Sequence, residues 1–326
     1  MSPFRKKIRQ FRKRLFHAML VPVELLLVRL ALSIIPRLSR ERALRFSRFL
    51  GGVAMHLCRR DCRYMRANLK LIYGDTMDKA EMRRFMRSVW NHAGLVLVDF
   101  FWFLRDTHER VTKYVDIDPS FTALSRGTDG CLGITAHIGN WELAAHSMCE
   151  HGREVTSVFA PIGATRLTQK ALLASRESSG QHLVAKQGAV LHLLRALRAG
   201  TIVGLLLDQF TKVTQGGMFV DFLGLPAPIS KIAGVLHTRR RCAVHIVACV
   251  HQGTGRYRSF ESAVLPADSG LTDEEVTQWV ADRLSDLVRQ YPEQWLWMYR
   301  RWRHVKPGDD PARYPYYAHS FNPLVD

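Results

Sequence analysis

The chain has 326 residues, 47% of them hydrophobic, and a net charge of +18. This length allows one large core with a small helical addition, and the positive charge indicates an anionic partner: nucleic acid, a membrane surface or an acidic substrate. The six cysteines form no Cys-x-x-Cys pair, which excludes a disulfide framework or structural zinc site and indicates a reduced, cytosol-facing protein.

The first 48 residues form a basic arm, with 13 Lys and Arg residues against two acids. An apolar stretch from Ala18 to Ile35 is interrupted by a proline and two charged residues. A spanning helix needs about 20 predominantly apolar residues, so we expect residues 1–40 to form a basic anchor in or on the inner leaflet, held by anionic lipid. A nucleic-acid-binding arm is the alternative, although no nucleic-acid motif accompanies it.

Residues 41–110 are predicted to form a helical segment. Arg63, Arg66 and Lys70 recur on one helix face and apolar residues on another, as in an ordinary amphipathic helix. The aromatic run Phe100-Phe-Trp-Phe103 favours core packing, and a place at the membrane interface is the alternative.

The stretch Gly133-Ile-Thr-Ala-His137-Ile-Gly-Asn-Trp-Glu142 combines an apolar run, a histidine, two turn formers and a carboxylate. We predict a buried strand from Cys131 to Ala136, a turn at Gly139-Asn140, and a helix that begins at Glu142. The turn would let the carboxylate reach the ring, fix one nitrogen as a donor and leave the other as a base. The alternative is a strand-end histidine that merely hydrogen-bonds a helix.

The remaining chain alternates strand-like and helix-like segments, which predicts an α/β fold: a mostly parallel sheet flanked by helices, with sites at strand ends. Strands are expected at Val155–Phe159, Ile202–Leu207 and Ala243–Val250, and a helix at Gly188–Ala199. Thr272-x-x-Glu275 is a capping box that opens another helix. We expect an α/β domain over residues 111–305, and a tail over 306–326.

Three further motifs follow His137-x4-Glu142 in order. They are Arg176-x3-Gly180; Gly204-Leu-Leu-Leu-Asp208-Gln209 with Gly217-Met-Phe-Val-Asp-Phe222-Leu-Gly224; and Pro292-Glu-Gln-Trp-Leu-Trp297 with Arg300-Arg-Trp302. Together with Arg63-x-x-Arg-Ala-Asn-Leu69, they resemble the bacterial late lipid A biosynthesis acyltransferases, the lauroyl and myristoyl transferases of the wider glycerolipid acyltransferase superfamily. The resemblance covers roughly residues 60 to 303.

This resemblance implies an O-acyltransferase that moves a fatty acyl chain from an acyl thioester to a hydroxyl of a lipid A precursor. His137 would be the general base and Glu142 would orient it. Arg176 and backbone amides near Gly139 would be oxyanion donors; an acceptor-phosphate contact or a surface arginine is the alternative for Arg176.

The other candidates are expected to bind substrate or shape its pocket. They are Asn140, Arg166, Asp208, Gln209, Phe222 and Gly224. A structural role is equally open for Asp208, and core packing for the Phe222 region. The family's Arg-Pro after the next strand is replaced here by Phe159-Ala160-Pro161, so Arg166 or Arg176 would have to supply that charge.

The partners expected from this resemblance are acyl carrier protein or acyl-CoA, an anionic lipid acceptor and the cytoplasmic face of the inner membrane. No cofactor beyond the thioester co-substrate, no metal and no nucleic acid are expected. The alternatives are the same chemistry on another glycolipid, aminolipid or lysophospholipid, hydrolysis of the thioester by water, or an inert membrane- or nucleic-acid-binding protein.

Overall fold

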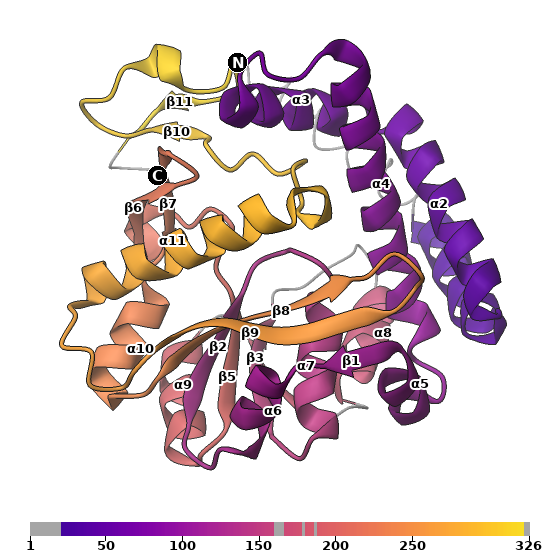
Figure 1. Ribbon diagram of the computed structural model, residues 1–326, viewed down its shortest axis with the longest axis horizontal. Helices are drawn as coiled ribbons and strands as arrows, with labels where there is room; N and C mark the ends of the chain where they lie inside the picture. The colour runs from indigo at the N-terminus through magenta and orange to yellow at the C-terminus, as the bar shows by residue number, and fades with distance from the viewer. Residues whose placement is uncertain (1–20, 160–165, 178–179, 186–187, 323–326) are drawn as a thin grey trace, which may run out of the picture.

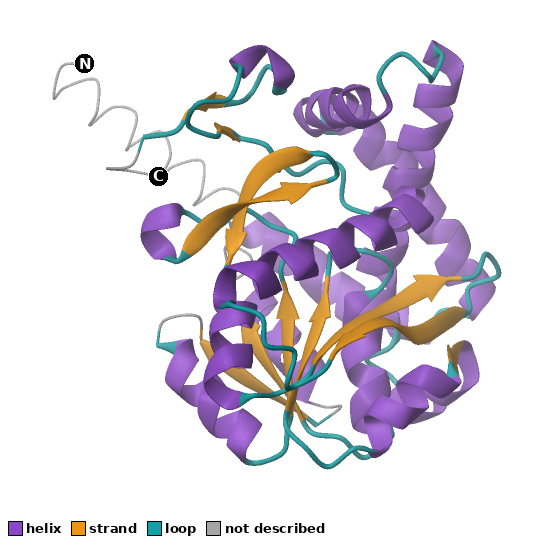
Figure 2. Cartoon of the chain, turned by 60° about the vertical axis from the view of Figure 1, so that its left-hand side comes forward, coloured by secondary structure: helices purple, strands orange, loops and turns teal. Residues whose placement is uncertain are grey.

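A computed structural model of the chain describes residues 21–159, 166–177, 180–185 and 188–322. A large twisted sheet lies at its centre with helices packed against both faces, and the helices of the first third lie along one side (Figures 1 and 2). The predicted α/β class is therefore confirmed.

The main sheet has seven strands in the order β1-β9-β8-β2-β5-β3-β4. Every neighbouring pair is parallel except β8 with β9, which is antiparallel. The strands are β1 (Val115–Ile117), β2 (Cys131–Thr135), β3 (Val155–Phe159), β4 (Gln181–Ala185), β5 (Ile202–Leu206), β8 (Val244–His251) and β9 (Tyr257–Leu265). Because β2 lies in the middle and is covered on both faces, all five of its residues are buried, which explains its continuous apolar sequence.

Residues 21–34 are helical, and ten further α-helices follow in the described chain. They are α2 (Arg40–Leu57), α3 (Arg59–Tyr73), α4 (Lys79–Trp102), α5 (Thr107–Tyr114), α6 (Pro119–Arg126), α7 (Trp141–Glu150), α8 (Arg166–Glu177), α9 (Ala189–Arg198), α10 (Ile232–Arg240) and α11 (Asp273–Gln290). The capping box predicted at Thr272 and Glu275 is present and opens α11.

Short elements complete the chain. They are the 3₁₀ turns η1 (Ile35–Arg37), η2 (Val213–Gln215), η3 (Pro292–Gln294) and η4 (Pro311–Arg313), the hairpin β6 (Gly217–Phe222) with β7 (Leu225–Ser230), and the pair β10 (His304–Val305) with β11 (His319–Ser320). The segment after η3 is unusually aromatic, and its three tryptophans are essentially fully buried in the main core: Trp295, Trp297 and Trp302. This segment therefore anchors the sheet to the hairpin and to α3 and α4.

The helix at residues 21–34 and α2 expose a series of large apolar side chains. On the first helix Leu26 and Leu27 are more than half exposed, and on α2 Phe49 and Leu57 are 64% and 75% exposed. Among the described residues, no helix combines the length and the apolar character needed to cross a bilayer.

Two glycines allow α2 and α4 to pack very closely. A Cβ atom at Gly51 would lie 2.6 Å from the Trp90 carbonyl oxygen, and one at Gly94 would lie 2.5 Å from that of Ser47. The neighbouring Gly52 has nothing within 4 Å of such a Cβ. The helix pair is also joined at Arg40 of α2, whose guanidinium forms a buried ion pair with Asp99 of α4.

We predict that Gly51→Ala lowers the free energy of unfolding by about 1–3 kcal/mol, because the added methyl group must push two helix backbones apart. Gly52→Ala is the matched control in the same helix; it should be neutral or stabilising by up to about 1 kcal/mol, since alanine is the better helix former. Urea unfolding of both variants measures the difference, and equal stabilities would contradict the proposed close contact.

Candidate active site

His137 and Asp208 meet because each follows one of two neighbouring parallel strands. Thr135 of β2 pairs with Leu206 of β5, so residues two positions further on lie side by side at the carboxyl edge of the sheet. The His137 ring Nδ1 is 2.7 Å from Asp208 Oδ1, and the His137 backbone N–H donates to Oδ2 over 3.0 Å. Ring and main chain are thus held by the same carboxylate.

A third donor completes the Asp208 site. The Trp295 indole Nε1–H donates to Asp208 Oδ2 over 2.8 Å, and Asp208 is only 3% exposed. Burial by itself raises the pKa of the Asp208 carboxyl, but the nearby His137 ring and the three hydrogen bonds to the carboxylate outweigh it, so this pKa lies below its ordinary value. Asp208 therefore stays ionised, which favours the Nδ1–H tautomer of His137.

This tautomer leaves the Nε2 lone pair of His137 as the basic atom of the site. The Gln209 amide Nε2 is 3.2 Å from it, in position to donate a hydrogen bond to that lone pair. The His137 side chain is 20% exposed, so its outer nitrogen lies at the surface of the site. The site therefore holds three groups in a row: the buried Asp208 carboxylate, the His137 imidazole and the Gln209 amide at its basic atom.

The structure corrects the expected partner of His137: the carboxylate on its ring is that of Asp208, not Glu142. Glu142 is instead in a two-point ion pair with Arg176 of α8, with Arg176 Nε 2.8 Å from Oε2 and Nη2 2.5 Å from Oε1. The physical reason is local: Asn140 caps α7 by accepting from the Leu143 N–H, and the helical turn that follows directs Glu142 toward α8.

Trp141 connects the two charge pairs. Its ring lies edge-on to that of His137, with 4.9 Å between centroids, and its indole N–H donates to Glu142 Oε1 over 3.2 Å. The ion pair of Glu142 with Arg176 therefore lies one aromatic ring away from the base, and both of its side chains are largely buried.

The loop between His137 and α7 is pinned by backbone hydrogen bonds. The Gly139 N–H donates to the Gln294 carbonyl oxygen and the Asn140 N–H to that of Cys249. Gly139 has φ +58, and a Cβ there would lie 2.1 Å from the Cys249 oxygen, so only glycine fits. The prediction that amides near Gly139 stabilise an oxyanion meets a physical obstacle, because two of them already have partners.

The other predicted substrate-binding residues lie apart from the ring. Asn140 is buried as the cap of α7. Phe222 is in the main core, 5.7 Å from the Trp295 ring centre, and Gly224 is exposed in the β6–β7 turn, so core packing and turn formation explain both positions. Arg166 begins α8, but its side chain is outside the described part of the structure.

Three residues near the site were not predicted. Trp295 holds Asp208, and the Gln294 side chain bonds both backbone groups of His251, so this stretch forms a structural corner. His92 of α4 lies 3.0 Å from the Gly139 carbonyl oxygen, and burial lowers its pKa to about 4, so it is neutral and can donate there. The concentration of tryptophans after η3 was the available signal for Trp295.

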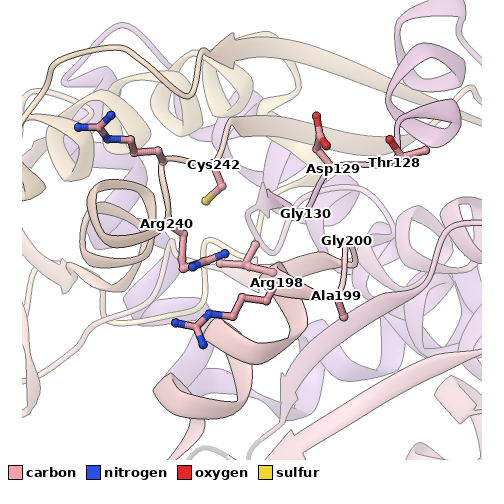
Figure 3. A pocket seen from close by; sticks show the side chains of 10 residues that line it. Thr128, Asp129, Gly130, Arg198, Ala199, Gly200, Arg240 and Cys242 are labelled. Carbon is pink, nitrogen blue, oxygen red and sulfur yellow. The ribbon is translucent and has the colours of Figure 1, made fainter.

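Two hollows lie on opposite parts of the sheet. The larger, about 410 Å³, is at the amino ends of β2, β5 and β8, far from His137. Figure 3 shows the guanidinium groups of Arg198 and Arg240 on one side of it and Asp129 on the other. These arginines end α9 and α10, where positive side chains offset the carbonyl ends of the helices. The second is an apolar cavity beside Glu142 and Arg176.

Comparison with known proteins identifies the family. Residues 10–304 match the family model described as bacterial lipid A biosynthesis acyltransferase. The chain belongs to this family. The match covers most of the chain and includes the strands, the helices and the tryptophan-rich segment that build the site. The family prediction made from the His137-x4-Glu142 motif and its companions is thereby confirmed.

The chain is also similar, at low identity, to a curated acyltransferase. The phosphatidylinositol mannoside acyltransferase of Mycobacterium tuberculosis (strain CDC 1551 / Oshkosh) is 24% identical over 206 residues, a match that spans 60% of this chain and 63% of that protein. Both comparisons are thus with acyltransferases, and their names concern two different glycolipids.

The lowered pKa of Asp208 predicts how the stability of the fold depends on pH. The Asp208 carboxyl binds its proton less readily in the folded than in the unfolded chain. Its contribution to the free energy of unfolding is therefore present above a pH of about 4 and is lost as the pH falls through the folded-state pKa. Asp208→Asn should therefore cost about 1–3 kcal/mol at pH 7, and less toward pH 3.

Urea unfolding at both pH values measures this. Asp75→Asn is the matched control, because the Asp75 side chain is 97% exposed and its loss should change stability little at either pH. A gap between wild type and Asp208→Asn that is independent of pH would contradict the assigned protonation state.

Proposed function

We propose that the protein is an O-acyltransferase that moves a fatty acyl group from a thioester, carried by acyl carrier protein or coenzyme A, to a hydroxyl of a lipid A precursor. The observation that carries this proposal is the His137 ring, bonded through Nδ1 to the buried Asp208 and facing the Gln209 amide through Nε2, in a chain of the lipid A acyltransferase family.

In the proposed reaction the acceptor hydroxyl replaces Gln209 as the donor to Nε2. His137 removes its proton while the oxygen attacks the thioester carbonyl, forming a C–O bond and a tetrahedral intermediate. Collapse of the intermediate breaks the C–S bond, and the imidazolium returns the proton to the leaving thiolate. Asp208 stabilises the imidazolium and keeps the ring oriented, the role that sequence analysis gave to Glu142.

The Glu142–Arg176 pair is proposed to act at the acyl donor instead. It lies beside the apolar cavity and is separated from the ring by Trp141. With its positive charge offset by Glu142, Arg176 is better suited to holding the cavity entrance than to stabilising an oxyanion alone. Asn140 would support this arrangement as the cap of α7 rather than as a substrate ligand.

A second candidate acceptor is a different glycolipid, a proposal favoured by the relative from Mycobacterium tuberculosis, which is named for a phosphatidylinositol mannoside. Both acceptor types carry a sugar hydroxyl, and the base chemistry described above does not distinguish between them. A panel of purified glycolipid acceptors with one acyl thioester decides between them, and transfer to the lipid A precursor alone would favour the first.

The surface is suited to work at an anionic membrane. The net charge is +18, and the helix at residues 21–34 and α2 expose apolar side chains. An amphipathic surface of this kind lies in the interface of a bilayer, with basic residues at the lipid headgroups. We propose that these two helices bind the cytoplasmic face of the inner membrane, where the lipid acceptor resides.

For the chemistry, we predict that His137→Ala lowers the rate of acyl transfer by about 10²- to 10⁴-fold while the fold is retained, because it removes the general base. Asp208→Asn should lower kcat, since the ring loses the carboxylate that orients it and stabilises the imidazolium formed in the reaction. Glu142→Gln should raise KM for the acyl donor and leave kcat in place.

One assay of radiolabelled acyl transfer with these variants distinguishes the role of Asp208 from that of Glu142. His192→Ala is the matched control, because His192 lies exposed on α9, and its rate should equal that of wild type. Wild-type rates in His137→Ala would end the proposal. A kcat that falls in Glu142→Gln and not in Asp208→Asn would return the orienting role to Glu142.

For the membrane surface, we predict that Phe49→Ser combined with Leu57→Ser weakens binding to anionic phospholipid vesicles about tenfold or more, because two exposed apolar side chains no longer enter the bilayer. Val264→Ser is the control, since Val264 of β9 is also exposed, at 44%, but lies on another part of the molecule. Co-sedimentation measures binding, and equal loss in the double variant and the control would contradict a specific membrane face.

A further inference from the structure

A line of four buried polar side chains connects α2 with the loop that follows His137. Its members are Arg40 of α2, Asp99 of α4, Tyr257 of β9 and Asn140. The Arg40 guanidinium pairs with the Asp99 carboxylate, with 3.0 Å between Nη2 and Oδ2. The Tyr257 hydroxyl donates to the same Oδ2 and forms a side-chain hydrogen bond with Asn140. The line thus ends at the residue that caps α7.

The polar groups of this line compensate one another. Arg40 also donates from Nε and Nη2 to the Gly255 carbonyl oxygen, over 3.0 and 2.7 Å. Burial and the Asp99 charge raise the pKa of the Tyr257 hydroxyl, so the hydroxyl is neutral and donates its hydrogen to Asp99. The Asn140 amide group is then the donor to the hydroxyl oxygen. A buried network with these partners specifies one arrangement of its side chains.

The loop after His137 is held from two sides of β2. On one side lies β5, which brings Asp208 to the His137 ring. On the other side lie β8 and then β9, which brings Tyr257 to Asn140. Asn140 in turn fixes the start of α7, because its side chain caps that helix. The next residue, Trp141, lies edge-on to the His137 ring, so the surroundings of the base depend on both sides.

Stability alone does not account for this line. A buried ion pair contributes little net stability compared with apolar side chains of the same volume, because removing both charges from water is costly. The Tyr257 ring is buried in an apolar cluster, and a phenylalanine ring would fill the same space. What the hydroxyl adds is a connection between Asp99 and Asn140.

We infer that Tyr257, held by the ion pair behind it, is a positioning residue of the site: through Asn140 it fixes the start of α7, where Trp141 packs on the base. The inference rests on the proposed function. Tyr257 is fully buried, and β8 separates its strand from β2, so it acts through Asn140 and not on the substrate. A shift of about 1 Å in a loop of this kind can cost about 100-fold in rate.

Two conservative substitutions cut this connection at its two ends. Tyr257→Phe removes only the hydroxyl. Asn140→Ser removes the amide donor, while serine remains a good cap for α7. Tyr314→Phe is the matched control: Tyr314 is also buried and its hydroxyl donates to the Asp309 carboxylate over 2.7 Å, but it lies in the tail after β10. Both tyrosine variants should melt a few degrees below wild type, because each loses a buried hydrogen bond.

Steady-state acyl transfer by the full-length variants measures kcat and KM. We expect Tyr257→Phe and Asn140→Ser each to lower kcat by about 10- to 100-fold. The double variant should lower it no more than about twofold further, because both substitutions remove one connection. The KM for the acyl donor should change by less than about threefold, since the Glu142–Arg176 pair keeps its own two hydrogen bonds. Tyr314→Phe should transfer at the wild-type rate.

The outcomes separate this inference from the proposed function. A kcat of Tyr257→Phe within about twofold of wild type, or single effects that multiply in the double variant, overturns the inference while the proposed function stands. If wild type transfers no acyl group, the proposed function falls, and hydrogen exchange of the segment 138–143, followed by mass spectrometry, decides. Exchange at least about fivefold faster in Tyr257→Phe than in Tyr314→Phe supports the positioning role, and equal exchange refutes it.

Discussion

A single buried carboxylate holds the site together. Asp208 accepts hydrogen bonds from the His137 main chain, the His137 ring and the Trp295 indole. An ionised carboxylate can be removed from water only when such donors compensate it. The ends of β2 and β5 and the segment after η3 must therefore come together before the ring is oriented, which makes the geometry of the base a property of the whole fold.

The local elements were predictable from the sequence because their signals are local. The strand before His137, the turn at Gly139, the helix that follows and the capping box of α11 all occur where expected. Apolar runs, glycine at positive φ and capping residues determine each of them within a few positions. The position of the base at a strand end follows directly from that pattern.

The partner of the base was not predictable in the same way. Asp208 is 71 residues from His137, and the two meet only because β5 is the neighbour of β2, an order that the sequence does not state. Glu142 was favoured because it is near in the chain, yet the helix directs it to Arg176. The antiparallel pairing of β8 with β9 and the β6–β7 hairpin were also missed, although each joins two strands that are consecutive in the chain.

The position of Gln209 affects how easily water could react in place of the acceptor in the proposed reaction. Its amide lies on the one lone pair of His137 that could activate solvent. A water molecule would have to displace the Gln209 amide by itself. A lipid acceptor could displace it with binding energy from its whole headgroup. In the proposed reaction, this contact would protect an acyl thioester bound at the ring from hydrolysis until the lipid acceptor binds.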